Sequence, residues 1–403
     1  MMSPNAKKLL ISNIKIFAQS GVIADGYIKI ENKYIKEVGS MESLSSTDEY
    51  EVIPVPQNSM VIPGMIDVHI HGVNGADVMD ATYESLDIMV NTLPKEGTTS
   101  FLATTMTESK PAIEKALQVT ADYMANQQSA SQAEILGIHL EGPFINENKA
   151  GAQPSDHILT PNKHTFLQFH ELSKQNIKLV TLAPELDQDF ELLQCLNEND
   201  IVASIGHSDA TYDEACQAIA YGARHVTHLF NQMTGLHHRN PGVVGAAFHK
   251  EELMVELIAD GIHVAPEVVD IAYRQLTEDR MILITDSMRA KCLKNGQYDL
   301  GGQMITVKDG KALLDENTLA GSVLKMNDAF KNIQLFTDAK IEQAMKMTAE
   351  NPAKQLNVFD RKGSIAPDKD ADLVLLDAEM NVCMTICRGH IAFKREDEQH
   401  ENH

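Results

Sequence analysis

The sequence is poor in cysteine and aromatic residues and contains no tryptophan. Five of its 403 residues are cysteines, an odd number, and their spacing does not match a zinc-knuckle motif. We therefore expect free, buried thiols rather than disulfides or metal ligands. The chain also lacks an apolar run of about 18 residues, which a membrane-spanning helix needs, and residues 1–11 lack the features of a signal peptide. These absences predict a cytoplasmic protein with no membrane partner.

Basic residues are also scarce. The chain has 34 lysines and arginines against 57 acidic residues, which gives a formal net charge of -23, and it has no long basic run. This balance argues against nucleic acid or an anionic membrane surface as the main partner. A substrate that carries phosphate would need a few local cations to hold it against the overall field.

Short strand patterns separated by turns occur at both ends of the chain. They cover residues 9–17, 26–31, 34–38, 50–56, 363–367, 371–376 and 381–386. The shared pattern predicts one small β-sandwich domain formed by both termini, residues 1–58 and 356–395. Residues 59–355 are interpreted as a separate domain, and the polar residues 396–403 as a disordered tail.

The middle of the chain alternates β-branched runs with amphipathic stretches. Eight strands are predicted, at residues 60–71, 98–104, 134–141, 177–184, 201–207, 225–231, 253–263 and 280–286. Helical stretches follow most of them, for example at 82–96, 110–126, 187–197, 211–221 and 266–277. This alternation indicates an α/β fold with a closed (β/α)8 TIM-like barrel.

An open doubly wound sheet is the alternative architecture. It would be expected to carry a glycine-rich phosphate loop after an early strand, and neither G-x-G-x-x-G nor a Walker sequence occurs in the chain. Residues 295–321 are rich in glycine and polar residues and are interpreted as an inserted hairpin before a closing helix at 324–335.

The ends of the predicted strands carry residues that bind metals or protons, and barrels of this kind place their active site there. His69 and His71 project to the same side of one strand, because side chains alternate along it. Histidines with a carboxylate suit zinc, iron or another late divalent transition metal. We predict one or two ions, with zinc favoured. The residues at these ends are His69, His71, Glu141, His207, His228 and Asp286.

This set of six residues indicates a metal-dependent hydrolase. A bound divalent cation lowers the pKa of its water towards neutrality and so supplies hydroxide as the nucleophile. Asp286 beside that water would take its proton and later give it to a leaving group. Taken singly, each residue also has a structural interpretation, such as a turn, a helix cap or a satisfied core histidine. His139 and Asp67 lie one layer deeper and are interpreted as groups of the barrel interior.

Several motifs extend the pattern beyond the strand ends. They are PGMIDVHIHG (63–72), HLEGPF (139–144), GHS (206–208), THLFN (227–231), DGIH (260–263), TD (285–286), LAGS (319–322) and NPA (351–353). In this order they resemble the amidohydrolase superfamily and, within it, the branch of deacetylases that act on phosphorylated amino sugars. The first motif is common to the superfamily, whereas EGPF, HLFN and LAGS are more specific to the deacetylases.

The resemblance implies hydrolysis of the acetamide of N-acetylglucosamine 6-phosphate to glucosamine 6-phosphate and acetate, in amino-sugar catabolism or recycling. It assigns Glu141, His207 and His228 to the main metal site. His69 and His71 match a second metal site that some members lack, and Asp286 matches the acid/base.

The resemblance also implies substrate contacts and a homodimer. Arg239 would reach across the dimer interface to the neighbouring site, and residues 319–322 would cover the acetyl group. Substrate-binding roles are implied for Gln153, Asn231, Gln232, His238, Arg239, His263, Leu319 and Ala320.

Two positions depart from the family pattern. Gln153 stands where some members have a histidine near the substrate carbonyl, and its neutral amide donates hydrogen bonds but cannot move protons. Gln232 stands where a smaller residue usually follows the asparagine in the family. Two other functions remain open: a cyclic-amide hydrolase of the dihydroorotase or hydantoinase kind, which usually bridges its metals with a carboxylated lysine, and a non-catalytic barrel scaffold.

Overall fold

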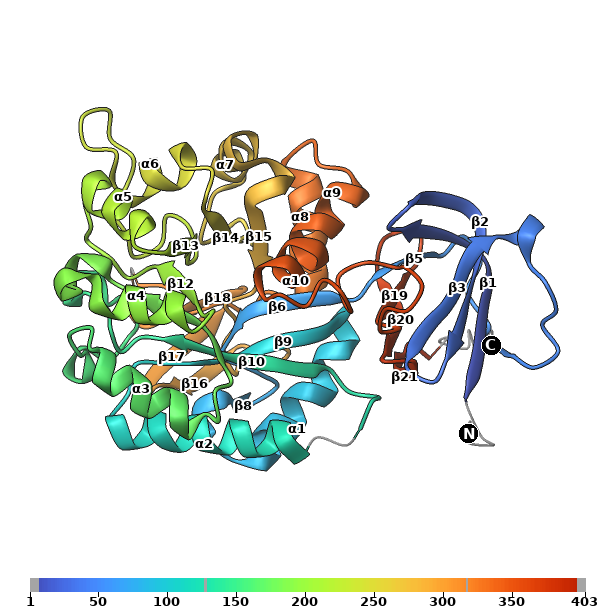
Figure 1. The fold of residues 1–403 in the computed structure, drawn as a ribbon, viewed down its shortest axis with the longest axis horizontal. Helices are drawn as coiled ribbons and strands as arrows, with labels where there is room; N and C mark the ends of the chain where they lie inside the picture. Colours follow the sequence, from blue (N-terminus) through green and yellow to red (C-terminus); the bar gives the residue numbers. More distant parts are fainter. Residues whose placement is uncertain (1–6, 127–128, 317, 397–403) are drawn as a thin grey trace.

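Figure 1 shows a computed structural model that describes residues 7–126, 129–316 and 318–396. A barrel of strands and helices occupies one side, and a smaller sheet formed by both ends of the chain occupies the other (Figure 1). Apart from Glu396, the predicted disordered tail lies outside the described residues.

The larger part is built on an eight-stranded sheet whose neighbours are all parallel and follow one another in chain order. The first and last strands close the ring through a bridge between Ile70 and Ser287 and a hydrogen bond from the Asp286 N–H to the His69 carbonyl (2.8 Å). The predicted (β/α)8 TIM-like barrel is confirmed. Its strands are β6 (Met65–Ile70), β9 (Thr98–Thr105), β10 (Glu134–Glu141), β11 (Ile177–Leu182), β12 (Val202–Ile205), β13 (Ala223–Val226), β14 (Met254–Ile258) and β15 (Met281–Ile284).

Helices cover the outside of this ring (Figure 1). In α2 the buried residues Ile113, Leu117 and Thr120 recur every three or four positions, which makes one stripe that faces the strands. No helix in the described part of the chain is both long enough and apolar enough to cross a bilayer. The helices are α1 (Tyr83–Thr92), α2 (Lys110–Asn126), α3 (Lys163–Leu172), α4 (Glu191–Glu198), α5 (Tyr212–Ala220), α6 (Gly242–His249), α7 (Pro266–Arg280), α8 (Met326–Phe336), α9 (Ile341–Met345) and α10 (Asn351–Gln355).

The second part is one hydrogen-bonded sheet in the order β21-β20-β19-β5-β1-β2-β3, with β4 beside β1. Buried side chains from both chain ends, such as Ile11, Ile28, Leu375 and Ile386, share one apolar core. The prediction that both termini form one small β domain is confirmed; its described strands form a single hydrogen-bonded sheet where a β-sandwich was predicted. Its strands are β1 (Lys8–Ala18), β2 (Gly21–Glu31), β3 (Tyr34–Ser40), β4 (Glu51–Val52), β5 (Met60–Pro63), β19 (Leu373–Leu376), β20 (Val382–Cys387) and β21 (His390–Lys394).

The predicted strand at residues 60–71 is two strands that serve different sheets. β5 pairs with β1 and β19 in the terminal sheet, whereas β6 opens the barrel. Gly64 lies between them, its N–H donates to the Asp372 carbonyl (2.9 Å), and a β-carbon there would collide with Thr99. The change of sheet occurs at Gly64 because only a residue without a side chain fits this close approach.

The insertion after β15 is a three-stranded antiparallel sheet: β16 (Gly296–Leu300), β17 (Gln303–Lys308) and β18 (Lys311–Leu313). The predicted hairpin is therefore present with one additional strand. It has its own small core, which includes Ile305 and Met106. The Gln303 amide donates to the Ala152 carbonyl (2.7 Å) and so holds the insertion against the loop that follows β10.

Candidate metal centre and active site

The C-terminal ends of five barrel strands bring together the six residues predicted to bind metal or to move protons. His69 lies on β6, and Glu141 is the last residue of β10. The other four residues, His71, His207, His228 and Asp286, follow the ends of β6, β12, β13 and β15. All six side chains are buried.

Three of these residues have a left-handed backbone, with φ values of 47° at His207, 27° at His228 and 47° at Asp286. A residue with a β-carbon adopts this conformation at a cost of about 1–3 kcal/mol, and it persists where the surrounding structure enforces it. Each of the three lies two residues beyond the end of its strand. The same left-handed backbone conformation therefore directs the side chains that follow three different strands towards one point.

Glu141, His207 and His228 form the first candidate ligand group. The Glu141 Oε1 atom is 3.2 Å from both Nε2 atoms, and these two nitrogens are 3.1 Å apart. Tetrahedral zinc with ligand distances of about 2.0–2.2 Å holds neighbouring ligand atoms roughly 3.3 Å apart. The three donor atoms therefore have the spacing that a single tetrahedral ion requires.

His69, His71 and Asp286 form a second group beside the first. The Asp286 Oδ1 atom is 3.4 Å from His69 Nε2 and 3.3 Å from His71 Nε2. Glu141 also contacts this group, through Oε1 to His69 (3.3 Å) and Oε2 to His71 (3.1 Å). One carboxylate thus faces both groups. The buried His69 Nε2 atom has no hydrogen-bond partner among the described residues, as expected of a metal ligand.

The electrostatics of the centre favour a cation. Burial raises the pKa of the Glu141 and Asp286 carboxyls, but His69 and its neighbouring imidazoles outweigh this effect and hold both pKa values below their ordinary range. Burial conversely lowers the pKa of His71, but Asp286 and Glu141 raise it to about 10. The carboxylates thus attract positive charge into the centre, and a divalent cation supplies it while the imidazoles stay neutral.

Two hydrogen bonds orient the first group. His207 Nδ1 donates to the Lys149 carbonyl (2.7 Å), which leaves Nε2 free as a ligand. The Gln153 Nε2 donates to Glu141 Oε2 (2.8 Å), while its Oε1 accepts the N–H of Thr107 (2.7 Å). At the position where the resemblance implies a substrate contact, Gln153 therefore also holds the carboxylate between the two ligand groups.

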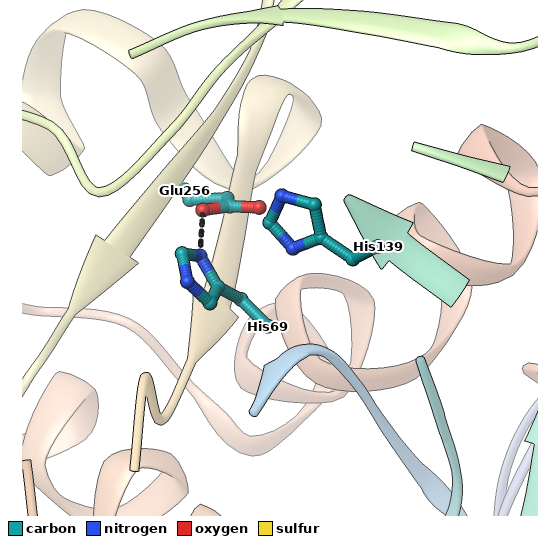
Figure 2. Close-up of side chains that lie close together, drawn as sticks. All are labelled: His69, His139 and Glu256. Atoms are coloured by element: carbon teal, nitrogen blue, oxygen red, sulfur yellow. Dashed lines mark hydrogen bonds and ion pairs between the residues drawn. The ribbon is translucent and has the colours of Figure 1, made fainter. Parts of the chain in front are cut away.

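Glu256 is a site residue that the sequence interpretation missed. It lies inside β14, is 0% exposed, and accepts a hydrogen bond from His69 Nδ1 (2.9 Å). Figure 2 shows this bond, with His139 on the other side of the carboxylate. A charged residue between Val255 and Leu257 in an apolar strand was the available signal, because buried carboxylates require a partner.

A cavity of about 240 Å³ opens over both ligand groups. Glu141, Asp286 and His71 form part of its lining, together with Met106, Leu300 and Thr318, which the sequence interpretation did not identify. Ala320 is fully buried and is not among the residues that line the cavity. Five residues predicted to contact substrate line the cavity: Gln153, Asn231, Gln232, His263 and Leu319.

His238 and Arg239 are not among the residues that line the cavity. They lie on an exposed loop after β13, where Arg239 Nη1 contacts His238 Nε2 at 2.7 Å. Within a single chain, these two residues predicted to bind substrate are therefore separate from the rest of the site.

The fold and the site define a class of protein. A (β/α)8 barrel that joins two histidine and carboxylate groups at its C-terminal mouth has the architecture of metal-dependent hydrolases. Residues 60–392 match the model of the amidohydrolase family. The chain belongs to the amidohydrolase family.

Within that family the similarity is to N-acetylglucosamine-6-phosphate deacetylases. The chain is 47% identical to the Bacillus subtilis (strain 168) enzyme over 96% of its own length and 98% of that protein. The crystal structure of the Thermotoga maritima enzyme has a TM-score of 0.86 at 35% identity and covers 96% of this chain and 100% of its own. A mutant of the Mycobacterium smegmatis enzyme, in complex with N-acetyl-D-glucosamine-6-phosphate, has a TM-score of 0.89 at 26% identity, with the same coverage. The resemblance inferred from the motifs is confirmed.

Proposed function

We propose that this protein hydrolyses the acetamide of N-acetylglucosamine 6-phosphate to glucosamine 6-phosphate and acetate. The observation that carries the proposal is the convergence of Glu141, His207, His228 and Asp286 at one cavity, in a chain whose similarity to such deacetylases extends over nearly its full length. The reaction serves amino-sugar catabolism or recycling in this proposal.

The two ligand groups would hold one or two divalent ions, with zinc as the favoured metal and iron as the alternative. Glu141, His207 and His228 would form the first site, and His69 and His71 would bind the second ion beside Asp286. When bound, the metal polarises the carbonyl and lowers the pKa of water towards neutrality.

Asp286 is proposed to move the proton. Its Oδ1 lies between the His69 and His71 nitrogens at the cavity wall, so the carboxylate reaches the space where the acetamide must sit. It takes a proton from the attacking water as the carbon–oxygen bond forms. It then delivers that proton to the amide nitrogen as the carbon–nitrogen bond breaks, which turns a poor leaving group into a neutral amine.

The sugar and its acetyl group are proposed to contact the remaining wall of the cavity. His263 Nδ1 donates to Asp260 Oδ2 (2.7 Å), so the buried Nε2 is left to bind a sugar oxygen. Asn231 and Gln232 would bind the sugar phosphate, and Leu319 with Ala320 would enclose the acetyl methyl group.

The phosphate is the reason to propose a homodimer. The described residues that line the cavity include histidines but neither lysine nor arginine, and the overall charge of -23 opposes an anionic substrate. Arg239 and His238, exposed on their loop, would supply the missing cations to the neighbouring subunit's cavity. We also propose a cytoplasmic location, because five cysteines in 403 residues, an odd number, do not suggest a disulfide framework.

A substrate comparison tests the proposal. Metal-loaded protein is incubated with N-acetylglucosamine 6-phosphate, its unphosphorylated form, dihydroorotate and hydantoin, and the release of amine and acetate or ring opening is measured. We expect turnover of the phosphorylated sugar at the highest kcat/KM. Turnover of only a cyclic amide, or of none of the four, contradicts the proposal. In this chain it is Glu141 that contacts both ligand groups, not the carboxylated lysine usual in cyclic-amide hydrolases, which supports the deacetylase.

A further inference from the structure

Glu256 occupies the layer of the barrel directly beneath the ligand groups. It is the central residue of β14 and does not line the cavity, so it does not touch substrate. Its side chain is 0% exposed. A carboxylate at such a depth is expensive to bury unless its partners compensate it.

The Glu256 Oε2 atom accepts two hydrogen bonds, each from a residue of a different ligand group. One comes from His69 Nδ1 (2.9 Å) and the other from the backbone N–H of His228 (3.1 Å). The two histidines belong to different strands, β6 and the end of β13. Glu256 is therefore a single acceptor that connects both halves of the centre.

The two bonds have different consequences. A neutral imidazole that donates through Nδ1 has its lone pair on Nε2, and the His69 Nε2 atom faces Glu141 and Asp286. The second bond holds the His228 backbone at its strained φ of 27°. The first bond selects the ligand atom of His69, and the second fixes the direction of His228.

His139 completes the surroundings without competing for Glu256 (Figure 2). Its ring lies edge-on against His69, with centroids 4.5 Å apart, and its Nε2 pairs with Thr181 Oγ1 at 2.8 Å. His225 Nε2 is 3.9 Å from the other carboxylate oxygen, beyond hydrogen-bond distance. His139 thus packs the His69 ring in place while Glu256 selects its tautomer.

We propose that Glu256 is a positioning residue that keeps His69 Nε2 available to the second ion and links the two ion sites through His228. This role rests on the metal-dependent function proposed above. It concerns how tightly the ions bind, which is measured without substrate.

The test compares Glu256→Gln with Glu96→Gln. The first variant keeps the shape of the side chain but weakens the acceptor. The second is a matched control, because Glu96 is also a buried carboxylate but pairs with Lys291 (2.8 Å). Zinc affinity per subunit is measured by competition with a chelator, and the visible spectrum is recorded with cobalt in place of zinc.

We expect Glu256→Gln to weaken binding of the ion held by His69 about ten- to hundredfold, the usual effect of losing such a partner, and to change the cobalt spectrum. Glu96→Gln should leave both unchanged. In a His69→Asn background, Glu256→Gln should add less than about a twofold further loss of affinity at the second ion site, because contacting residues are not additive. Unchanged zinc affinity in Glu256→Gln, or an equal loss with and without His69, overturns the proposal.

A direct measurement on the unmodified protein covers the case in which Glu256→Gln does not fold. In zinc-loaded protein labelled with 15N-histidine, the His69 signals are assigned by their loss in His69→Asn. A proton on Nδ1 and none on Nε2 supports the proposal. A proton on Nε2 overturns it. So does a further zinc ion bound by Nδ1, since His69, His139 and Glu256 also lie close enough together to hold an ion. Because these readouts need no substrate, failure of the deacetylation assay and failure of this inference are distinguishable.

Discussion

Strand β10 begins with a half-buried glutamate and ends with a buried one, and the two have opposite surroundings. Its first residue, Glu134, meets the guanidinium of Arg361 (2.9 and 3.0 Å) and the ammonium of Lys362 (2.8 Å). Its last residue, Glu141, meets imidazoles at 3.1–3.3 Å. Cations that stay charged at neutral pH compensate the first carboxylate, whereas imidazoles can exchange their protons for a metal ion, so the second carboxylate remains able to bind one.

The comparison shows what distinguishes a structural charge cluster from a functional one. Around Glu134, Lys362 also contacts Asp370 and Asp372, so charges of both signs are paired within the protein. This cluster joins the start of β10 to the segment that leads into the terminal sheet. Around Glu141 the donors converge on a cavity instead. A change at one end of β10 should therefore leave the other end unaffected.

The largest effect is expected from removal of metal. Extensive chelation should abolish nearly all deacetylation, and zinc should restore it, because the proposed attack depends on the water that the ion activates. Bound zinc should also raise the Tm, since it binds the folded state preferentially. Activity assays and thermal melts before and after chelation check this. Full turnover by protein shown to be metal-free would contradict it.

Asp286→Asn should lower kcat by about 10²–10⁴-fold, the usual contribution of a positioned acid/base. The amide retains the shape and an oxygen beside His69 and His71, so most of the metal should remain bound. Steady-state kinetics and metal analysis of the same sample check both statements. If turnover stays within about twofold of the original, which is about 0.4 kcal/mol of barrier, another group moves the proton.

Lys362→Met should destabilise the fold by about 3–5 kcal/mol, because it leaves buried carboxylates without their cation. Lys346→Met is the matched control: Lys346 is 29% exposed and pairs with Asp279 at the surface, so its loss should cost less than about 1 kcal/mol. Urea unfolding measures both. The kcat of the folded Lys362→Met protein should be unchanged. A large fall in kcat would contradict this and show that the cluster at the start of β10 affects catalysis at its end.

Arg239→Ala should raise KM for N-acetylglucosamine 6-phosphate about ten- to hundredfold, as expected for a lost charge-assisted contact to phosphate. The kcat/KM for unphosphorylated N-acetylglucosamine should not change. Arg274→Ala is a suitable control, because Arg274 is an exposed arginine, 71% accessible, on α7. Equal losses on both substrates would show that Arg239 acts on the structure rather than on the phosphate.

The smallest effect is a pH dependence at the Glu134 end. Burial opposes ionisation of Glu134, but Lys362 and Arg361 outweigh it and lower its pKa from 4.5 to about 2. A depressed folded-state pKa stabilises the protein above the unfolded value, and this contribution is lost as the pH falls from about 4.5 through about 2. As the pH falls across this range, the urea concentration at the unfolding midpoint should therefore decrease less in Glu134→Gln than in the original protein. Equal decreases in the two proteins would contradict the role of the contacts between Glu134 and its two cations.

Several site residues could be found from the sequence because their signal is local. The strand ends could be counted from β-branched runs, and parallel barrel strands bring their C-terminal ends together whatever lies between them. His69 and His71 were recognisable because their spacing places them on one side of a strand and four later strand ends also carry residues that bind metals or protons. The role of Gln153 in holding Glu141 was not, because the contact depends on how the loop after β10 folds back.

The division of residues 60–71 shows the same limit in the fold. Apolar alternation continues across Gly64, so the pattern does not reveal that β5 and β6 belong to different sheets. The reason is the close approach of the Thr99 side chain, which comes from a strand more than 30 residues away in sequence. Glu256 was missed likewise, since its two partners lie on other strands.

By itself, the order of residues determined the alternation of strands and helices, the chemistry available at each strand end and the family to which the chain belongs. These depend on side-chain type and on the periodicity of the backbone. Only the tertiary structure decided that Glu141 faces two ligand groups, that Glu256 supports both, and that Arg239 lies away from its own cavity. Those facts depend on distances between distant segments, which are set by ring closure and packing.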